Sequence, residues 1–315
     1  MIRTWVHNNI LPQASILGIY KKARLVFTFH DISERHSAHF HPVYSTEPQV
    51  FIEQIKWIRS HFKILSLDAL MSNHDDKHPS NVASIVFDDG FLSVYTSAFP
   101  FLKKEGIPFS IFVNKFAVQN NWLWSSNLLI NLQAGNEVFL RSVYEKCFGD
   151  EKMEFEQFVK DPFGVLISQK KNIRTDWFED ENITKTPIYL SETQLIALNQ
   201  NGVHIASHTV NHKILSSCSS QELESEIAEN CAYLENLSGS KVDHLAIPFG
   251  FPGTYDQRAL QTARKFHTYI YSTDRHLVTQ GPLTPRLGIR NDSRKDLVKH
   301  TNVAVLYRIL KQPRV

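Results

Sequence analysis

The sequence predicts an α/β fold in which parallel strands close into a barrel. Short, almost wholly apolar segments recur along the chain and alternate with segments whose apolar residues are spaced as in a helix. This alternation is typical of a parallel sheet, and the number of repeats favours a closed barrel over an open sheet. The chain has 315 residues, of which 42% are hydrophobic and 21% charged, enough to bury one large core.

The first part of the pattern predicts three strands and two helices. Segment 24–33 (RLVFTFHDIS) is β-branched and aromatic and ends in polar residues, as a buried strand entering a loop does. Helical spacing follows in 46–62, and 82–87 (VASIVF) is the next strand. Segment 93–106 predicts a helix that ends at a glycine, and 108–113 (PFSIFV) predicts another strand.

The last part of the chain repeats this order. A capping-box pattern from Ser191 to Gln194 opens a helix predicted over 191–202. The elements expected after it are strand 203–208, helix 219–239, strand 244–250, helix 255–266, strand 268–273 and strand 285–290.

The middle of the chain interrupts the pattern. From about 116 to 187 clear β-strand runs are missing, and a tryptophan-rich stretch is followed by a charged one. We expect residues 1–315 to form one domain with a mainly helical insertion at about 116–187 that could roof the site. Trp122, Trp124 and Trp177 could stack on sugar rings there, although core packing is the more common role of such residues.

Composition argues against several classes of protein. The formal charge is +2 without a dense basic stripe, so nucleic acid is a poor candidate as a partner. Cys147, Cys218 and Cys231 match no zinc or redox spacing, and we expect them to be reduced thiols. No apolar run is long enough to span a bilayer, and no secretion signal is evident, so we expect a cytoplasmic protein. The stretch 10–20 (ILPQASILGIY) could still associate with a membrane surface.

Polar residues follow the predicted strands where those strands end. Because the carboxyl ends of parallel barrel strands share one mouth, these residues should converge. They are His30-Asp31, Asp88-Asp89-Gly90, Ser207-His208 and Pro248-Phe249-Gly250.

Two of these groups predict a metal site. Adjacent carboxylates such as Asp88 and Asp89 repel each other unless a cation or a proton separates their roles. His208 and His212, four residues apart, would lie on one side of a helical turn and could share an ion with Asp89. Two imidazoles and a carboxylate suit Zn²⁺ and leave positions for water and substrate. Taken singly, a DDG triplet is typical of a solvated turn, and an isolated histidine pair is weak support for a ligand site.

Three stretches together resemble the polysaccharide deacetylase family, the NodB-homology or carbohydrate esterase family 4 hydrolases. They are SIVFDDGFLS (84–93), ASHTVNHKILS (206–216) and LAIPFGFP (245–252). The resemblance covers roughly 24–113 and 188–290. It implies a distorted (β/α) barrel of about seven strands and a metal-dependent hydrolase that removes N-acetyl groups from sugars.

The resemblance also implies roles for individual residues. Asp88 corresponds to the general base, and Asp89, His208 and His212 correspond to the metal ligands. The N–H of Phe249, which follows Pro248, corresponds to the donor that stabilises the oxyanion.

The proton donor and the third motif depart from the common family pattern. The late Leu-x-His motif has no clear match here, and His300 is poorly placed, so the resemblance points to His30 on the first strand as the acid. His30 could instead be a hydrogen-bonded core histidine. Arg286 resembles the arginine that orients the base, with Arg290 as the alternative. Ala246 stands where an arginine commonly opens the third motif, which puts that arginine's contacts in doubt.

We therefore expect a metal-dependent hydrolase that removes N-acetyl or similar acyl groups from a carbohydrate, which could be a polysaccharide, a glycolipid or an activated precursor. Zn²⁺ is the expected ion, while Co²⁺, Ni²⁺ and Fe²⁺ also suit the ligands. Two alternatives stay open at this point. One is a non-haem Fe(II) oxygenase, which uses the same two-histidine, one-carboxylate set, and the other is a catalytically inactive carbohydrate-binding barrel.

Overall fold

The structure is a computed structural model that describes residues 23–72, 81–149, 153–180, 186–273 and 283–289, together with Asn291 and Thr301. The predictions for residues 10–20, Arg290 and His300 lie outside these residues. None of the helices in the described ranges combines the length and the apolar character that a bilayer-spanning helix needs.

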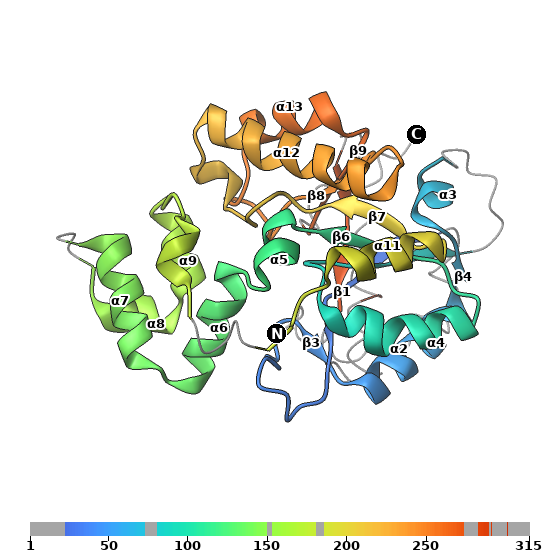
Figure 1. Ribbon diagram of the computed structural model, residues 1–315, viewed down its shortest axis with the longest axis horizontal. Coiled ribbons are helices and arrows are strands. Elements are labelled where there is room, and N and C mark those ends of the chain that lie inside the picture. Colours follow the sequence, from blue (N-terminus) through green and yellow to red (C-terminus); the bar gives the residue numbers. More distant parts are fainter. Residues whose placement is uncertain are drawn as a thin grey trace, which may run out of the picture.

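A single parallel sheet forms the centre of the molecule and confirms the predicted α/β barrel (Figure 1). Eight strands follow one another in the order β10-β9-β8-β7-β6-β5-β1-β11, and a short strand, β4, pairs with the start of β5. The strands are β1 (Arg24–Phe29), β4 (Lys63–Ile64), β5 (Val82–Phe87), β6 (Phe109–Val113), β7 (His204–Ser207), β8 (His244–Ala246), β9 (Tyr269–Ser272), β10 (Leu283–Pro285) and β11 (Leu287–Gly288). A separate two-stranded sheet pairs β2 (Asp31–Ile32) with β3 (Ser45–Thr46).

The barrel closes at Arg286. The strand predicted at 285–290 is in fact two short strands, because the chain changes pairing partner on either side of this residue. β10 pairs with β9 and β11 pairs with β1, so consecutive strands occupy the two ends of the strand order. The backbone N–H of Arg286 still donates to Ser272, and that of Ile289 donates to Thr28. Arg286 therefore lies at the seam where the sheet edges meet.

Helices cover the outside of the barrel, with α12 and α13 on one side and α2, α4 and α11 on the other (Figure 1). Their caps follow the predicted signals: α11 and α12 each have a complete capping box, and Gly106, Gly202 and Gly239 adopt left-handed conformations after helices. The bounds are α2 (Pro48–His61), α3 (Leu67–Ser72), the π-helix η3 (Val94–Ala98), α4 (Phe99–Lys104), α11 (Glu192–Gln200), η5 (Leu215–Ser217), α12 (Ser220–Ser238) and α13 (Gln257–Phe266).

Between β6 and β7 the chain forms a group of helices that lies beside the barrel (Figure 1). Trp122 and Trp124 are buried in the apolar cluster that holds these helices together, so they pack in the core as such residues commonly do. Phe249, from the barrel, packs against the same cluster. The helices are α5 (Lys115–Asn120), α6 (Trp124–Ala134), α7 (Glu137–Phe148), α8 (Phe155–Lys160), α9 (Pro162–Ser168) and the 3-10 helix η4 (Thr175–Phe178). The contact between Phe249 and this apolar cluster brings α6 to the mouth of the barrel.

Candidate active site

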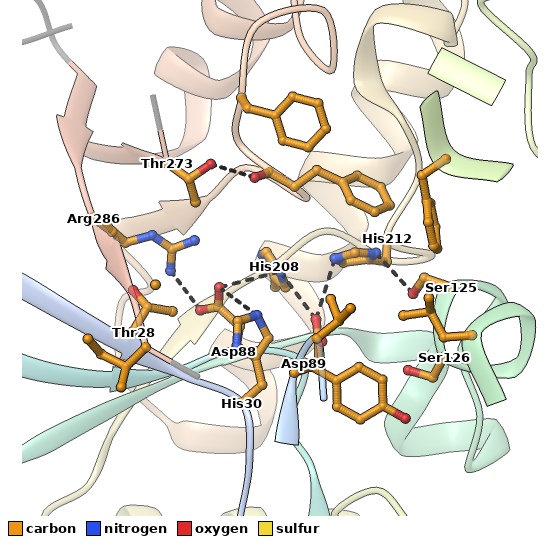
Figure 2. Close-up of a pocket in the computed structure, with 18 residues that line it drawn as sticks. Thr28, His30, Asp88, Asp89, Ser125, Ser126, His208, His212, Thr273 and Arg286 are labelled. Carbon is orange, nitrogen blue, oxygen red and sulfur yellow. Dashed lines mark hydrogen bonds and ion pairs between the residues drawn. The ribbon is translucent and has the colours of Figure 1, made fainter. Parts of the chain in front are cut away.

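A cavity of about 600 Å³ opens at the carboxyl ends of the barrel strands (Figure 2). Parallel barrels place their ligands at this end because the loops that follow the strands converge there. The polar side chains that line the cavity are those of Thr28, His30, Tyr44, Asp88, Asp89, Ser125, Ser126, His208, His212, Thr273 and Arg286. Six of the predicted site residues are among them, and Phe249 also lines the cavity.

Asp88 and Asp89 come from the turn that follows β5, and they point to different neighbours (Figure 2). Asp88 continues the strand, since its backbone N–H donates to the Phe29 carbonyl at 2.9 Å. Asp89 and Gly90 then adopt left-handed conformations, with φ of 68° and 76°. Aspartate and glycine tolerate this backbone region better than most residues. The turn thereby gives two adjacent carboxylates two separate environments.

Asp89, His208 and His212 form a buried cluster. Oδ1 of Asp89 lies 3.3 Å from Nε2 of His208 and 3.4 Å from Nε2 of His212. Burial raises the pKa of Asp89, but His212 and His208 outweigh it, so the net pKa is lowered and the group is a carboxylate. Among the described residues, this oxygen has no hydrogen-bond partner. A buried anionic oxygen that faces two imidazole nitrogens is a suitable set of ligands for a divalent cation.

The other nitrogen of each imidazole has its own partner. Nδ1 of His208 lies 2.8 Å from the Ala246 carbonyl, which can only accept, so Nδ1 carries the proton and Nε2 keeps its lone pair. Nδ1 of His212 lies 3.4 Å from the Ser125 hydroxyl. Burial lowers the pKa of His212 to about 4, so this ring is neutral at physiological pH. Both rings are therefore oriented as metal ligands are.

The predicted helical turn over His208–His212 is wrong. The segment is a loop in which Thr209 and His212 have left-handed backbone conformations, with φ of 68° and 56°. Glu226 on α12 holds this loop, because it accepts from the backbone and the side-chain amide of Asn211 at 2.8 and 2.7 Å. Asn114 donates to the carbonyls of His208 and Thr209. These side-chain bonds replace the backbone bonds of a helix, and they still bring both rings to one side.

Asp88 lies beside the cluster and is held by Arg286. Nη1 of Arg286 is 2.6 Å from Oδ1 of Asp88, and both side chains are buried. The other oxygen, Oδ2, faces His30 and His208, whose Nε2 atoms lie 3.8 and 3.9 Å away. Burial raises the pKa of Asp88, but the charges of Arg286, His208 and His30 together lower it by more, so the net pKa is below its usual value. One oxygen of Asp88 is thus fixed while the other faces the cavity.

His30 follows β1, and its ring enters the cavity opposite His212 (Figure 2). Its side chain is 27% exposed, so it is reachable from the solvent, unlike a core histidine. Nδ1 of His30 has no partner among the described residues. That atom is buried, whereas Nε2 lies 3.8 Å from Asp88, too far for a hydrogen bond, so Nε2 can bond to a molecule in the cavity.

Pro248 and Phe249 form the turn after β8. Phe249 has a φ of 61°, and its carbonyl accepts from the Thr273 hydroxyl at 2.7 Å. A Cβ atom on Gly250 would lie 2.7 Å from the Thr273 backbone nitrogen, so the close contact of these two segments requires glycine. The Phe249 ring centroid is 4.7 Å from that of His212, and its N–H has no hydrogen-bond partner in the described ranges.

Several residues that support this site were not singled out from the sequence. Ser125 lies in a serine pair that resembles a surface turn, and only the fold brings it to His212. Glu226 and Asn230 are buried on α12, where Asn230 donates to Val113 and Ser207. The sequence does contain a signal for Glu226 and Asn230: both interrupt the apolar face of a long helix. Buried polar groups need partners, so such residues indicate polar contacts inside the protein.

The fold and these residues define a class of protein. The mouth of the parallel barrel holds two histidines and a carboxylate that could bind an ion together, and beside them a second carboxylate with a free oxygen. These are the parts of a metal-assisted hydrolase. Comparison with known proteins narrows this class. A family model described as polysaccharide deacetylase matches residues 75–270, and the chain belongs to this family.

Individual relatives agree with the family assignment. YxkH of Bacillus subtilis (strain 168), which is named as a polysaccharide deacetylase, is 22% identical to this chain over 249 residues. The match covers 78% of this chain and 62% of YxkH, so the chain spans less than two thirds of that relative.

Solved structures show the same fold. The deacetylase PplD of Streptococcus pyogenes, solved in complex with acetate, superposes with a TM-score of 0.58 at 15% identity over 88% of this chain and 96% of PplD. IcaB from Ammonifex degensii superposes with a TM-score of 0.57 at 17% identity, over 91% of this chain and 97% of IcaB.

Proposed function

We propose that this protein is a metal-dependent deacetylase that hydrolyses the amide of an N-acetylated sugar. The observation that carries the proposal is the arrangement at the barrel mouth. His208 and His212 face Oδ1 of the Asp89 carboxylate, and all three side chains are buried. Asp88 lies beside them, and in the described part of the chain Arg286 forms a hydrogen bond with only one of its two oxygens. Membership of the polysaccharide deacetylase family supports the same reaction.

Asp89, His208 and His212 would hold the ion. Their buried, partly unpaired atoms fit a divalent cation, and the donor set suits Zn²⁺ while also admitting Co²⁺, Ni²⁺ or Fe²⁺. When bound, such an ion supplies Lewis acidity, which polarises a carbonyl oxygen and makes a neighbouring water more acidic.

Asp88 accepts the proton of the attacking water. Its Oδ2 atom faces the cavity, and its depressed pKa means that it is ionised and ready to accept. The ion pair with Arg286 fixes the carboxylate in one orientation, so that this oxygen does not rotate away.

Phe249 and His30 act on the other atoms of the amide. The Phe249 N–H donates to the carbonyl oxygen as negative charge develops on it. His30 donates a proton to the amide nitrogen as the C–N bond breaks, so water adds across the amide to give acetate and a free amino sugar. His30 and His208 face the same oxygen of Asp88, Oδ2, at 3.8 and 3.9 Å, so the proposed acid and the proposed base lie side by side at the cavity (Figure 2).

The cavity suits a carbohydrate substrate in size and lining. A volume of about 600 Å³ lies within the usual range for pockets that enclose small molecules. Hydroxyl groups of Thr28, Ser125 and Ser126 lie near the charged residues, while the exposed ring of Phe251 provides an aromatic surface. This mixture of polar and aromatic surface is what a sugar ring binds.

Acetate release tests the proposal. The metal-loaded chain is incubated under anaerobic conditions with N-acetylated oligosaccharides, lipid-linked sugars and sugar nucleotides, with and without a chelator. We expect acetate from at least one class of substrate, loss of release with chelator, and recovery with added Zn²⁺ or Co²⁺. A His208→Ala chain serves as the inactive control.

The same experiment separates the two alternatives. An oxygenase would need dioxygen and an oxidisable cosubstrate, so turnover that depends on these and releases no acetate would overturn the proposal. A binding barrel without activity would retain the sugars and release no acetate under any condition.

A further inference from the structure

A second cluster of ligand-type side chains lies at the opposite end of the barrel. Its members are Asp68 on α3, His204 at the start of β7 and His244 at the start of β8. The candidate catalytic residues follow the far ends of the same two strands. His204 and His208 are four positions apart, a span of roughly 13 Å at the rise of a β-strand.

The three side chains are close enough to share one ion. One ligand atom from each lies within 4.8 Å of the other two. Nε2 of His244 and Oδ1 of Asp68 are hydrogen-bonded at 2.7 Å, so an ion would replace this bond. The rings of His204 and His244 are 4.9 Å apart and nearly perpendicular. In the described part of the chain, only this group and the Asp89 cluster meet these conditions.

Hydrogen bonds orient both rings as they do at the candidate active site. Nδ1 of His244 lies 2.7 Å from the Tyr271 hydroxyl, and Nδ1 of His204 lies 3.1 Å from the Ser110 hydroxyl. Both hydroxyl-bearing residues are buried. Without an ion, the Asp68 carboxylate can only accept, so Nε2 of His244 carries the proton and Nδ1 accepts from Tyr271. A hydroxyl can also accept from Nδ1–H, so an ion bound at Nε2 would reverse this bond and hold the ring as metal-bound histidines are held.

The cluster is open to the solvent on one side. The Asp68 side chain is 62% exposed, so an ion from solution can reach the cluster. Two neutral imidazoles and one carboxylate are ligands that Zn²⁺ and similar ions bind well.

We propose that Asp68, His204 and His244 form a second, structural binding site for a divalent cation such as Zn²⁺. The ion would connect α3 to the starts of β7 and β8, far from the substrate cavity. This inference does not depend on the deacetylase activity. The competing explanation is a hydrogen-bond chain from Asp68 through His244 to Tyr271 that needs no ion.

Zinc binding to a chain without the first site tests the proposal. The full chain carrying His208→Ala and His212→Ala is freed of metal with a chelator and titrated with ZnSO₄ by calorimetry. We expect about one Zn²⁺ per chain to bind and to raise the melting temperature, because the ion binds the folded state.

Two further substitutions place that ion. In this background, Asp68→Asn and, separately, His204→Ala should weaken zinc binding by more than the roughly 10–100-fold that loss of an outer partner costs. Asp243→Asn is the matched control, since Asp243 adjoins His244, pairs with Lys241 and lies outside the cluster. Its charge acts on both rings without bonding to the ion, so its loss should weaken zinc binding by much less than either of the other substitutions.

Any other pattern overturns the proposal. If the background chain binds no zinc, the cluster is a hydrogen-bond chain only. If zinc binds and its affinity is unchanged by both Asp68→Asn and His204→Ala, the ion lies elsewhere. Because Asp68 is exposed, Asp68→Asn should leave the metal-free chain folded, which its melting curve with chelator verifies.

Discussion

At the scale of single residues, Asp88 and Asp89 are neighbours in the chain with different surroundings. Asp89 faces two histidines and Asp88 faces an arginine. Asp88→Asn should therefore retain metal and lose turnover by about 10²–10⁴-fold, because the proton acceptor is removed. Asp89→Asn makes the same chemical change at the neighbouring residue and should lower metal affinity. Metal content and acetate release of both variants test this, and near-normal turnover in Asp88→Asn would exclude it as the base.

Arg286 provides a second prediction at this scale. Its charge lowers the pKa of Asp88, so Arg286→Gln should raise that pKa and move the acid limb of kcat/KM to higher pH. The stability that the lowered pKa contributes is present above the unfolded pKa and is lost as pH falls. The variant should lack this contribution and lose about 3–5 kcal/mol at neutral pH, because it leaves a buried charge unpaired.

Arg258→Gln is the control for that experiment. Arg258 pairs with Asp256 at 2.7 Å, but its side chain is 47% exposed, so the loss should stay below about 1 kcal/mol. Equal stabilities and equal pH profiles for the two variants would contradict the role assigned to Arg286. Denaturant unfolding and pH-rate profiles provide both readouts.

The identities of these residues could be predicted from sequence because they follow apolar strands and share a barrel mouth. The contact of Arg286 with Asp88 was predicted from a motif, and the structure places them in contact. Ser125 could not be found in this way, since no local pattern relates it to His212, 87 residues away. Their functional roles stay predictions until the variants are measured.

At the scale of elements, the turn after β8 positions the Phe249 N–H. Gly250→Ala would place a Cβ atom 2.7 Å from the Thr273 nitrogen in a left-handed backbone, so this turn would have to move. We expect a clear loss of stability and of kcat, because the N–H would leave its position.

Gly135→Ala is the matched control for Gly250→Ala. Gly135 has a φ of 63°, and its Cβ would contact nothing within 4 Å. It should cost only about 1–2 kcal/mol for the left-handed alanine and leave kcat unchanged. Equal effects of the two substitutions on kcat would show that the turn does not position a catalytic group.

Most elements could be predicted because apolar period and caps agree, as in β5, which the sequence located to the residue. Two predicted elements were wrong, and both have a tertiary cause, while the short elements β2, β3, β4 and α3 were not predicted. The loop after β7 lacks helical backbone because Glu226 and Asn114 hold it in another conformation. The strand predicted at 285–290 is divided because barrel closure makes its two halves pair with different neighbours.

At the scale of the whole molecule, buried histidines make stability depend on pH. Burial lowers the pKa of His267 from 6.5 to about 4. Between these values the unfolded chain binds the proton and the folded chain does not, so the free energy of unfolding falls as pH falls from 6.5 towards 4. The contribution of this one residue is on the order of 3 kcal/mol.

Comparison of the chain with His267→Gln isolates this contribution. Urea unfolding of both metal-free chains between the two pH values should show a shallower pH dependence for the variant. Identical slopes would mean that His267 is protonated in the folded protein or exchanges its proton without a change in stability.

The fold class of the whole molecule was predictable from the number and spacing of strands, and the structure confirms it. The position of the helices beside the barrel was not readable in the same way. It depends on an apolar cluster that joins residues from Trp122 to Ile214, and no local pattern encodes such contacts. The expectation of a cytoplasmic location stays a prediction.

The most direct test of the central claim is anomalous diffraction at the zinc absorption edge from crystals of the zinc-loaded chain. The account predicts a peak roughly 2.0–2.2 Å from Asp89 and from Nε2 of His208 and His212, with Asp88 outside the ligand set. The absence of a peak between these three residues, or a peak bound by Asp88 in place of Asp89, would contradict it.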